Sequence, residues 1–559
     1  MSVVFSNVTM RKIFTFGVLV AATTAVPVVD KPHPPYLGDL RWEASRTPSN
    51  WSNLSVETRT GTFIGSFNES YPNVRQFLRV PFAQVRVPSE KEEVCPLYNR
   101  LSLSQPPVGD LRWMPPQKVP PSRKRYDATM YGPVCPQYVQ SQDSFWKDYE
   151  PASSVLNLGE NRTQGSVAWS SAEDCLSIAI WTPANVSKAS KLPVALFATG
   201  GAGLEGGITI PAHLPTQWVS RSQEHIAITM NYRVNIFGNP KSRALPETSL
   251  SLLDMRAAVE WVYENIEAFG GDPDNIFLWG QSQGGALTHI YTLAFPDNPL
   301  VASYGIISQE PGTTLDLSTT SDPYRDFDIV AKALGCNYGD DAEAELNCMR
   351  MLSWVQIEEY INRYTGTPPI SFMAYIPDER YIFANETLLY LEGKVAKGPA
   401  IRSFAAREIA VDNNITSSQA DARQWACLAA SDTALRFSHG LPTYRYFWAG
   451  NFSNISPVPW LGAFHYSDLV MIFGTYVKSV GEISQLEIDT SNTMQDFLLA
   501  FVKDPSTVSQ VVGWPLFNPN EPNGGLIVEF GKDVPAKNIT GHYVDGGCYD
   551  SSIAFKVDG

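Results

Sequence analysis

A serine in a glycine-rich turn is the first residue of the sequence that could do chemistry. Residues 280–284 read Gly-Gln-Ser-Gln-Gly, directly after an apolar run and directly before a stretch with helical spacing. A strand, a strained turn and a helix in this order lift a serine hydroxyl clear of the backbone, and side chains at the two glycine positions would clash. The alternative is an ordinary glycine-rich helix start. The context favours Ser282 as a nucleophile.

A serine hydroxyl is a poor nucleophile at its free pKa and needs a general base. In chains with this type of turn, an acid and then a histidine follow the serine. Of the seven histidines, His439, His465 and His542 satisfy that order and lie beyond the helix that follows Ser282. His465 lies in a loop of small residues, "WLGAFHYSDLVMIFG", before an apolar run, and this position makes it the favoured base.

Acyl transfer also needs fixed N–H donors for the developing oxyanion. The segment "ATGGAGLEGG", residues 198–207, follows an apolar run and offers exposed backbone, and the residue after the serine, Gln283, offers another N–H. A phosphate-binding loop is the alternative. It is disfavoured because the segment lacks the Walker lysine and does not fit Gly-x-Gly-x-x-Gly leading into a helix.

The elements that would position these residues alternate between strands and helices. Apolar runs at 192–198, 225–233, 276–279 and 304–308 predict strands, and 252–269 and 285–295 predict helices. Such alternation predicts a mostly parallel sheet covered on both faces. No repeat, low-complexity tract or linker divides the chain after the first 25 residues.

The remaining features favour a secreted protein. "MRKIFTFGVLVAATTAVPVV", which starts at Met10, reads as a signal peptide ending near residue 25, with Met10 as the true start; a membrane anchor is the alternative, but the apolar run is too short. The net charge of −15 argues against nucleic acid or an anionic membrane as partner.

Seven cysteines without zinc-ligand spacing favour disulfides, with one cysteine left over. Ten Asn-x-Ser/Thr sites fit glycosylation: Asn50, Asn53, Asn68, Asn161, Asn185, Asn385, Asn414, Asn451, Asn454 and Asn538.

Several stretches together resemble the type-B carboxylesterase/lipase family, which includes cholinesterases and fungal lipases. The resemblance runs from about residue 56 to near the C-terminus, and it implies one large α/β-hydrolase domain, a single domain over 26–559, without metal or cofactor. It rests on "VRQFLRVPFAQ", "PPVGDLRW", "AEDCLSIAIWTP", "NYRVNIFG", "LLDMRAAVEWVYENIEAFGGDPDNIFLWGQSQGG" and "GAFHYSDLVMIFG".

The family's catalytic residues fall on particular positions of this chain. Its nucleophile falls on Ser282, its histidine on His465 and its acid on Glu408, within "GPAIRSFAAREIA", where the residues flanking the acid depart from the family pattern. Nothing else in the sequence marks Glu408, and a surface glutamate is the alternative. Glu310, after the predicted strand 304–308, is the second candidate acid.

The resemblance further implies oxyanion donors at the N–H groups of Gly201, Ala202 and Gln283. The family's usual His-Gly-Gly-Gly-Phe reads Thr-Gly-Gly-Ala-Gly here, and a backbone donor survives the change of glycine to alanine if φ allows. The usual glutamate before the serine is Gln281, which removes a negative charge near the histidinium. We expect activity to survive, and we do not expect choline esters as substrates.

The resemblance also implies a pairing of the cysteines, and one segment of the chain interrupts the family pattern. It implies the disulfides Cys135–Cys175, Cys336–Cys348 and Cys427–Cys548, and it leaves Cys95 unpaired. Cys95 lies in residues 85–105, which interrupt the family pattern. Two explanations stay open: a retained intron of 63 nucleotides, or a genuine surface loop.

We therefore expect a secreted serine hydrolase that cleaves carboxylic esters through Ser282, Glu408 and His465. Its substrate would be a small-molecule or lipid ester, and the sequence leaves acyl length and oligomeric state open. One alternative is a lipase for long-chain acylglycerols. The other is a cholinesterase-like binding protein that has lost the chemistry.

Overall fold

Residues 54–68, 70–84, 112–137, 171–409, 415–456, 458, 460–478 and 481–557 are described by the computed structural model. The expected signal peptide and the segment 85–105 lie outside these ranges. Within them, no helix combines the length and the apolar character needed to cross a membrane.

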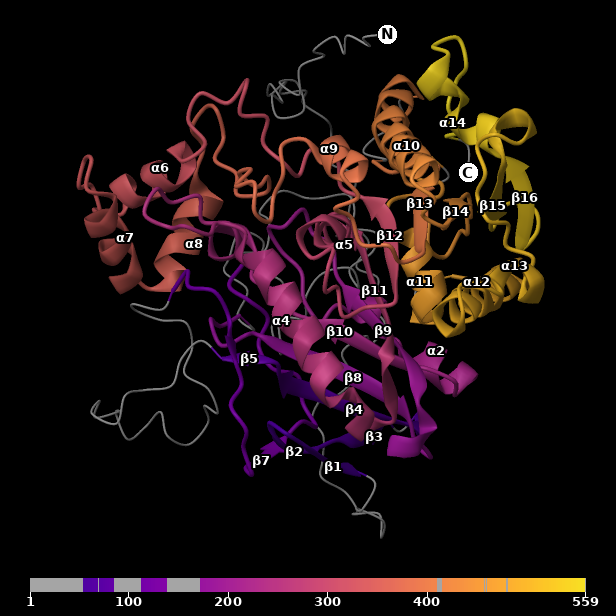
Figure 1. The fold of residues 1–559 in the computed structure, drawn as a ribbon, viewed down its shortest axis with the longest axis horizontal. Helices are drawn as coiled ribbons and strands as arrows, with labels where there is room; N and C mark the ends of the chain where they lie inside the picture. The colour runs from indigo at the N-terminus through magenta and orange to yellow at the C-terminus, as the bar shows by residue number, and fades with distance from the viewer. Residues whose placement is uncertain are drawn as a thin grey trace, which may run out of the picture. The chain divides into compact units, whose positions relative to one another are not determined.

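An eleven-stranded sheet forms the centre of the described chain (Figure 1). From β15 through to β10 each neighbouring pair of strands is parallel, and the pairs at both sheet edges are antiparallel. The prediction of a mostly parallel α/β-hydrolase sheet is confirmed. In spatial order the strands are β16 (Ala536–Thr540), β15 (Leu526–Phe530), β14 (Thr443–Trp448), β13 (Ala400–Ala405), β12 (Ser303–Gln309), β11 (Gly271–Ser282), β9 (Leu192–Ala198), β10 (Ile226–Met230), β8 (Ser177–Pro183), β4 (Tyr71–Pro81) and β3 (Ser66–Asn68).

Helices cover the sheet on both faces, and Figure 1 shows α4 crossing in front of the strands. The 3₁₀ turns are η6 (Lys188–Ser190), η7 (Pro211–His213), η8 (Ile266–Phe269), η9 (Thr475–Lys478) and η10 (Pro522–Gly524). Two small sheets comprise β1 (Ser55–Thr58), β2 (Gly61–Ile64) and β7 (Arg125–Asp127), and β5 (Ala83–Gln84) and β6 (Gln117–Lys118). The helices are α2 (Thr216–Ser222), α3 (Asn235–Gly238), α4 (Leu250–Asn265), α5 (Gln283–Ala294), α6 (Arg325–Ala333), α7 (Ala342–Met351), α8 (Trp354–Arg363), α9 (Glu386–Leu391), α10 (Ile415–Ser438), α11 (Ser467–Phe473), α12 (Gln485–Lys503), α13 (Val508–Val511) and α14 (Gly541–Tyr549).

The alternation of side chains along the central strands explains why both faces need cover. In β9, Val194 and Leu196 belong to a core cluster with apolar residues of α4 and α5. The intervening Ala195 and Phe197 belong to a second cluster with residues of α2, α11 and α12. Successive residues of a strand point to opposite faces, so an uninterrupted apolar run is what a strand covered on both sides requires.

The predicted elements are found at the predicted places, and the lengths differ most in two strands. The run 225–233 forms a strand only over Ile226–Met230 (β10), and β11 is longer than predicted. The apolar run 276–279 predicts a short strand, whereas β11 spans Gly271–Ser282. Its extra residues are Gly271–Asn275, within the break "GGDPDN", where Gly271 pairs with Leu192 and the register shifts before Ile276, and Gly280–Ser282, which pair with β12. At such an irregularity more residues of one strand lie opposite fewer of its neighbour, so the residues between Gly271 and Ile276 have no partner in the β9–β11 ladder.

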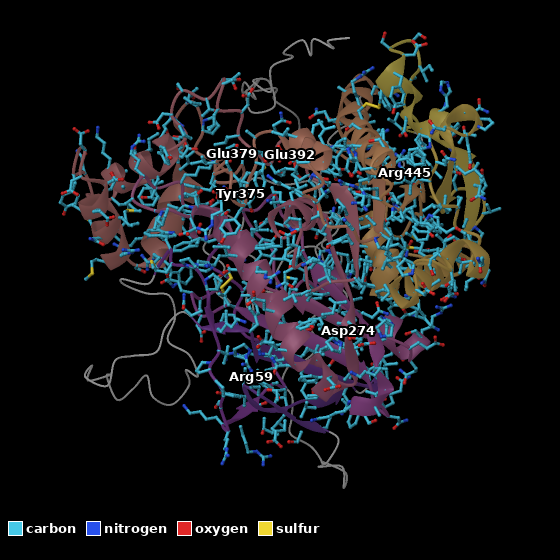
Figure 2. All side chains as sticks on the ribbon, viewed as in Figure 1. Arg59, Asp274, Tyr375, Glu379, Glu392 and Arg445 are labelled. Atoms are coloured by element: carbon cyan, nitrogen blue, oxygen red, sulfur yellow. A yellow bond between two sulfur atoms is a disulfide. The ribbon has the colours of Figure 1, made fainter. Side chains whose placement is uncertain are left out.

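Three disulfides join cysteines of the described ranges: Cys135–Cys175, Cys336–Cys348 and Cys427–Cys548. They are the same three pairs that the resemblance implied, and Figure 2 shows disulfide sulfurs in yellow. The last pair joins α10 to α14 across 121 residues of sequence. Closing loops of this size typically stabilises a fold by ~2–4 kcal/mol each.

Candidate active site

Ser282 lies at the junction of β11 and α5 in a strained backbone conformation. Its φ and ψ are 57° and −123°, which a non-glycine residue adopts at a cost of about 1–3 kcal/mol. A Cβ at Gly284 would lie 2.1 Å from the carbonyl oxygen of Ala198, and one at Gly280 would lie 2.3 Å from the backbone of Gly284. Only glycine fits these two positions, as the strand–turn–helix prediction required.

His465 and Glu408 are brought together from two loops that are distant in sequence. The N–H of Arg407 donates to the carbonyl oxygen of Ala463 at 3.0 Å, which holds the loop after β13 beside the loop before α11. His465 Nδ1 then lies 2.5 Å from Glu408 Oε2. The second carboxylate oxygen, Oε1, accepts the backbone N–H of Ala405 at 2.6 Å. The Glu408 side chain is fully buried, so both of its oxygens depend on these partners.

The surroundings of His465 favour its charged form. Burial by itself lowers the pKa of a histidine, but the attraction of Glu408 and its hydrogen bond outweigh burial and raise the pKa of His465. The indole of Trp425, from α10, packs against the imidazole with ring centroids 4.7 Å apart. An aromatic face of this kind also favours a neighbouring cation.

Ser282 and His465 each have another hydrogen-bond partner in this structure. Within the described chain, Ser282 Oγ donates to Glu310 Oε2 at 3.0 Å. The side-chain amide of Gln281 lies 2.8 Å from His465 Nε2. Because Nδ1 of a neutral His465 donates to Glu408, Nε2 is the acceptor of the Gln281 amide. The second candidate acid, Glu310, thus contacts the serine and not the histidine, and sequence reasoning did not foresee the Gln281 contact.

The loop after β9 runs against this turn. A Cβ at Gly200 would lie 2.8 Å from the Cβ of Ser282. Gly201, Ala202 and Gly203 all have positive φ, of 114°, 53° and 70°. Among the described residues, the amide N–H groups of Gly201 and Ala202 have no hydrogen-bond partner. Alanine at position 202 thus adopts the left-handed backbone that the loop needs, and its N–H stays available to a ligand.

A bulky amide fills the position after the serine. Gln283 is fully buried at the start of α5, and its Nε2 donates to the hydroxyl of Tyr375 at 3.2 Å. A Cβ at Gly203 would lie 3.4 Å from the Gln283 side chain. The backbone of Gly203 and the side chain of Gln283 therefore lie next to each other, at a distance that leaves little space for a side chain at position 203.

The buried carboxyl group of Glu358 supports the same loop through Asn235. The N–H of Asn235 donates to the carbonyl oxygen of Gly203 at 2.6 Å, and its side-chain amide donates to Glu358 Oε2 at 2.8 Å. Glu358, from α8, is completely buried. Burial raises its pKa well above the ordinary range, although the hydrogen bond from Asn235 opposes this. Among the residues that the structure describes, Glu358 Oε1 and Asn235 Oδ1 have no hydrogen-bond partner.

Glu358→Gln is expected to stabilise the protein more as the pH rises. Because the pKa of Glu358 is higher in the folded than in the unfolded protein, Glu358 stays protonated in the folded protein at pH values where it is ionised in the unfolded chain. The free energy of unfolding therefore falls as the pH rises from about 4.3 toward the folded-state pKa, by ~1.4 kcal/mol per pH unit. Glutamine removes that dependence, and its amide can donate to Asn235 Oδ1. The midpoint of thermal unfolding should rise at pH 8 and change little at pH 5. Glu359→Gln, at a half-exposed position on the same helix, is the control; an equal effect at both pH values would contradict the prediction.

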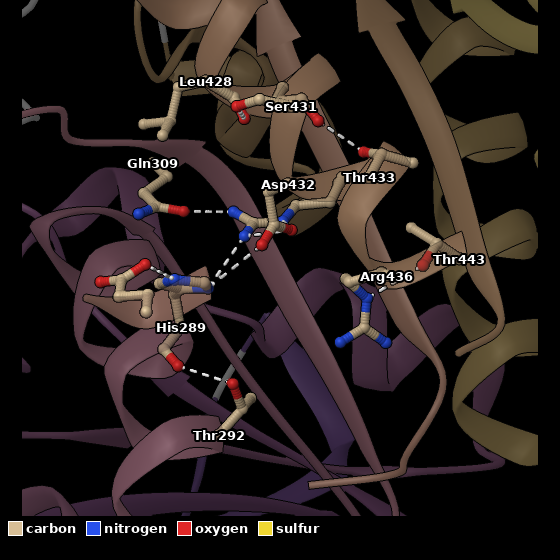
Figure 3. Close-up of polar contacts among 12 residues, drawn as sticks. His289, Thr292, Gln309, Leu428, Ser431, Asp432, Thr433, Arg436 and Thr443 are labelled. Carbon is tan, nitrogen blue, oxygen red and sulfur yellow. Dashed lines mark hydrogen bonds and ion pairs between the residues drawn. The ribbon is translucent and has the colours of Figure 1, made fainter. Parts of the chain in front are cut away.

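A second buried network fixes the end of β12 (Figure 3). Arg402, on β13, donates from Nε to Asp432 Oδ2 at 2.6 Å and from Nη2 to His289 Nδ1 at 2.9 Å, and its Nη1 donates to Gln309 Oε1. His289 also hydrogen-bonds Glu386 through Nε2. His289 thus takes part in a buried network away from the Ser282 hydroxyl. The network anchors Gln309, the residue directly before Glu310.

Comparison with known proteins decides the family. The model of the carboxylesterase family matches residues 97–424, more than half of the chain. Chlorogenic acid esterase of Aspergillus niger is 35% identical over 474 residues, which cover 82% of this chain and 84% of that protein. The chain belongs to the carboxylesterase family. The resemblance described above is confirmed, and the protein is a carboxylic ester hydrolase with the α/β-hydrolase fold.

Other members of the family are similar over most of their length. Secreted lipase 5 of Gibberella zeae is 30% identical, over 89% of this carboxylesterase and 95% of the lipase. Acetylcholinesterase of Bungarus fasciatus is 24% identical, over 85% of this chain and 83% of that enzyme. Esterases and lipases thus share this fold, so the choice among their substrates depends on the site.

Proposed function

We propose that this carboxylesterase is a secreted serine esterase in which Ser282 is the nucleophile, His465 the general base and Glu408 the acid of the triad. One observation carries the proposal: the buried Glu408 carboxylate contacts His465 Nδ1 in the same site as the strained Ser282 turn, and His465 reaches the residue next to Ser282. Glu408 thereby sets the tautomer in which Nε2 can accept a proton.

The reaction begins when the Ser282 side chain rotates from Glu310 toward His465 Nε2 and displaces the Gln281 amide. Oγ attacks the ester carbonyl carbon, and His465 takes the Oγ proton. The N–H groups of Gly201, Ala202 and Gln283 stabilise the oxyanion, to which one donor typically contributes ~3 kcal/mol. His465 then protonates the leaving alcohol. Water, activated by the same histidine, hydrolyses the acyl-enzyme and restores Ser282.

Secretion is supported by two observations of different kinds. One similar protein is named a secreted lipase, and three disulfides lie in the described chain. Disulfides form and persist in oxidising compartments outside the cytosol. We therefore place the enzyme outside the cell, acting on small-molecule esters there. An extended acyl chain is the second candidate substrate, because the similarity to secreted lipase 5 spans nearly all of that protein.

Labelling with an alkyl fluorophosphonate, a reagent for nucleophilic serines, tests the nucleophile. Modification of the Ser282 peptide at one equivalent, with loss of turnover, is the expected result. A label on another serine, or turnover that persists after Ser282 is modified, would refute the assignment.

A substrate panel tests the ester class. Rates for p-nitrophenyl acetate, butyrate and palmitate and for a hydroxycinnamoyl quinate ester should favour the short or aromatic acyl groups. A preference for palmitate at an emulsion interface would instead support the hypothesis of a lipase for long acyl chains. If the folded protein hydrolysed none of these esters, the result would support the alternative of a binding protein that has lost the chemistry.

A further inference from the structure

A second carboxylate reaches the proposed nucleophile from the neighbouring strand. Glu310 follows β12 directly, and its Oε2 accepts the Ser282 hydroxyl at 3.0 Å. The backbone N–H of Glu310 donates to the carbonyl oxygen of Ser282 at 3.1 Å. The two residues are therefore joined through both backbone and side chain, at the carboxyl ends of adjacent parallel strands.

A distortion of β12 turns Glu310 toward Ser282. In the β11–β12 ladder Gln281 pairs with Ile307, but Ser282 pairs with Gln309, so Ser308 is skipped. Ser308 has φ 40°, a left-handed conformation that serine rarely adopts. A skipped residue reverses which side of the strand the following side chains occupy, and bulges of this type re-aim side chains next to active sites. The Arg402–Gln309 hydrogen bond holds the strand end in place.

Glu310 is electrostatically coupled to the proposed base. The pKa of Glu310 is raised above its ordinary value, chiefly by burial and also by the negative charge of Glu408, although the attraction of His465 and the hydrogen bond from Ser282 oppose this. In return, the negative charge of Glu310 is one of the groups that raise the pKa of His465. The other carboxylates facing His465 are Glu408, on Nδ1, and Asp468 of α11, which accepts the hydroxyl of Tyr446 at 2.7 Å.

The residue beside the nucleophile is neutral. Gln281 is buried and its amide reaches His465 Nε2 at 2.8 Å, so this position stabilises the neutral imidazole as a hydrogen-bond donor and brings no charge. A carboxylate that stabilises the histidinium on the serine side must come from elsewhere, and Glu310 is the carboxylate that contacts Ser282 Oγ.

We propose that Glu310 is a further catalytic residue, which holds the Ser282 hydroxyl in the resting enzyme and supplies the negative charge that stabilises protonated His465 during acylation. The inference rests on the proposed function. When Oγ bonds to the carbonyl carbon, its proton passes to His465 Nε2, and the Oγ–Glu310 hydrogen bond is broken. The released Glu310 carboxylate then faces the new imidazolium, and it takes no proton itself.

The test removes the negative charge at position 310 and introduces a negative charge at position 281. Four proteins are compared by kcat and kcat/KM against pH: wild type, Glu310→Gln, Gln281→Glu and the double variant Gln281→Glu/Glu310→Gln. Glu310→Gln should lower kcat/KM about tenfold, equivalent to ~1.4 kcal/mol. It should also move the acid limb of the profile to lower pH, because the loss of a negative charge lowers the pKa of His465. The double variant should recover both the rate and the position of the limb.

Each other outcome overturns the inference. If Glu310→Gln changes neither rate nor limb, Glu310 has no catalytic role. If the rate falls and the double variant does not recover it, Glu310 acts only through packing and hydrogen bonding. If Glu310→Gln does not fold, Gln281→Glu alone decides: an added charge should move the limb to higher pH, and an unmoved limb counts against the electrostatic role.

Two controls separate this inference from the proposed function. Glu392→Gln removes a surface carboxylate that forms an ion pair with the exposed Lys394, and it should leave rate and profile unchanged. Labelling of Ser282 by the fluorophosphonate tests the function independently of Glu310. If Ser282 is labelled and the limb does not move, only the role of Glu310 fails; if Ser282 is not labelled, the proposed function fails.

Discussion

Ser282→Ala is expected to lower kcat/KM for p-nitrophenyl esters by about 10⁴–10⁶-fold, the range found when the nucleophile of a serine triad is removed. The variant loses the atom that forms the acyl-enzyme, and only the oxyanion donors and substrate binding remain. The fold should not change, because alanine at φ 57° carries the same backbone strain as serine and the side chain loses only its hydrogen bond to Glu310.

Steady-state rates and the midpoint of thermal unfolding, measured on the same preparations, check this expectation. Ser303→Ala is the matched control: Ser303 is a buried serine at the other end of β12, and its hydroxyl has no hydrogen-bond partner within the described part of the chain. It should keep wild-type turnover. If Ser282→Ala retained more than a tenth of the activity, another nucleophile would carry the reaction; if both variants lost activity, the loss would lie in the fold.

The parts of the site that the sequence predicted are those with local causes. The turn around Ser282 was recognisable because the backbone allows only glycine at positions 280 and 284, and the clash distances of 2.3 and 2.1 Å show why. The sheet was recognisable because strands covered on both faces need unbroken apolar runs, as in β9. These constraints act on consecutive residues, so they leave a pattern in the sequence.

The contacts that hold the proposed triad have no such pattern. Glu408 and His465 are 57 residues apart, and they meet because Arg407 pairs with Ala463 between two loops. No residue near Glu408 signals this, and only the family resemblance pointed to it. The position of Glu310 depends on the bulge at Ser308, the residue skipped in the ladder. No glycine stands there to mark the bulge in the sequence. Tertiary packing determines both contacts.

Glu408→Gln is expected to lower kcat/KM by about 10³–10⁴-fold, although the side chain keeps its shape. Oε1 accepts the backbone N–H of Ala405 at 2.6 Å, and Oε2 accepts His465 Nδ1–H at 2.5 Å. Glutamine has one oxygen and one NH₂ group at these two places. Since the Ala405 N–H is fixed and needs an acceptor, the amide oxygen takes that side and the NH₂ group faces Nδ1. His465 then carries its proton on Nε2, the tautomer that cannot accept the proton of Ser282.

The same substitution decides which carboxylate is the acid of the triad. Glu408→Gln should cost far more than the tenfold expected of Glu310→Gln, because Glu408 determines the tautomer while Glu310 contributes only charge. Loss of the Glu408 charge also lowers the pKa of His465, so the residual activity should persist to lower pH. Glu408→Asp keeps the charge on a shorter side chain and should recover part of the rate. A large loss in Glu310→Gln together with a small one in Glu408→Gln would reverse the two roles.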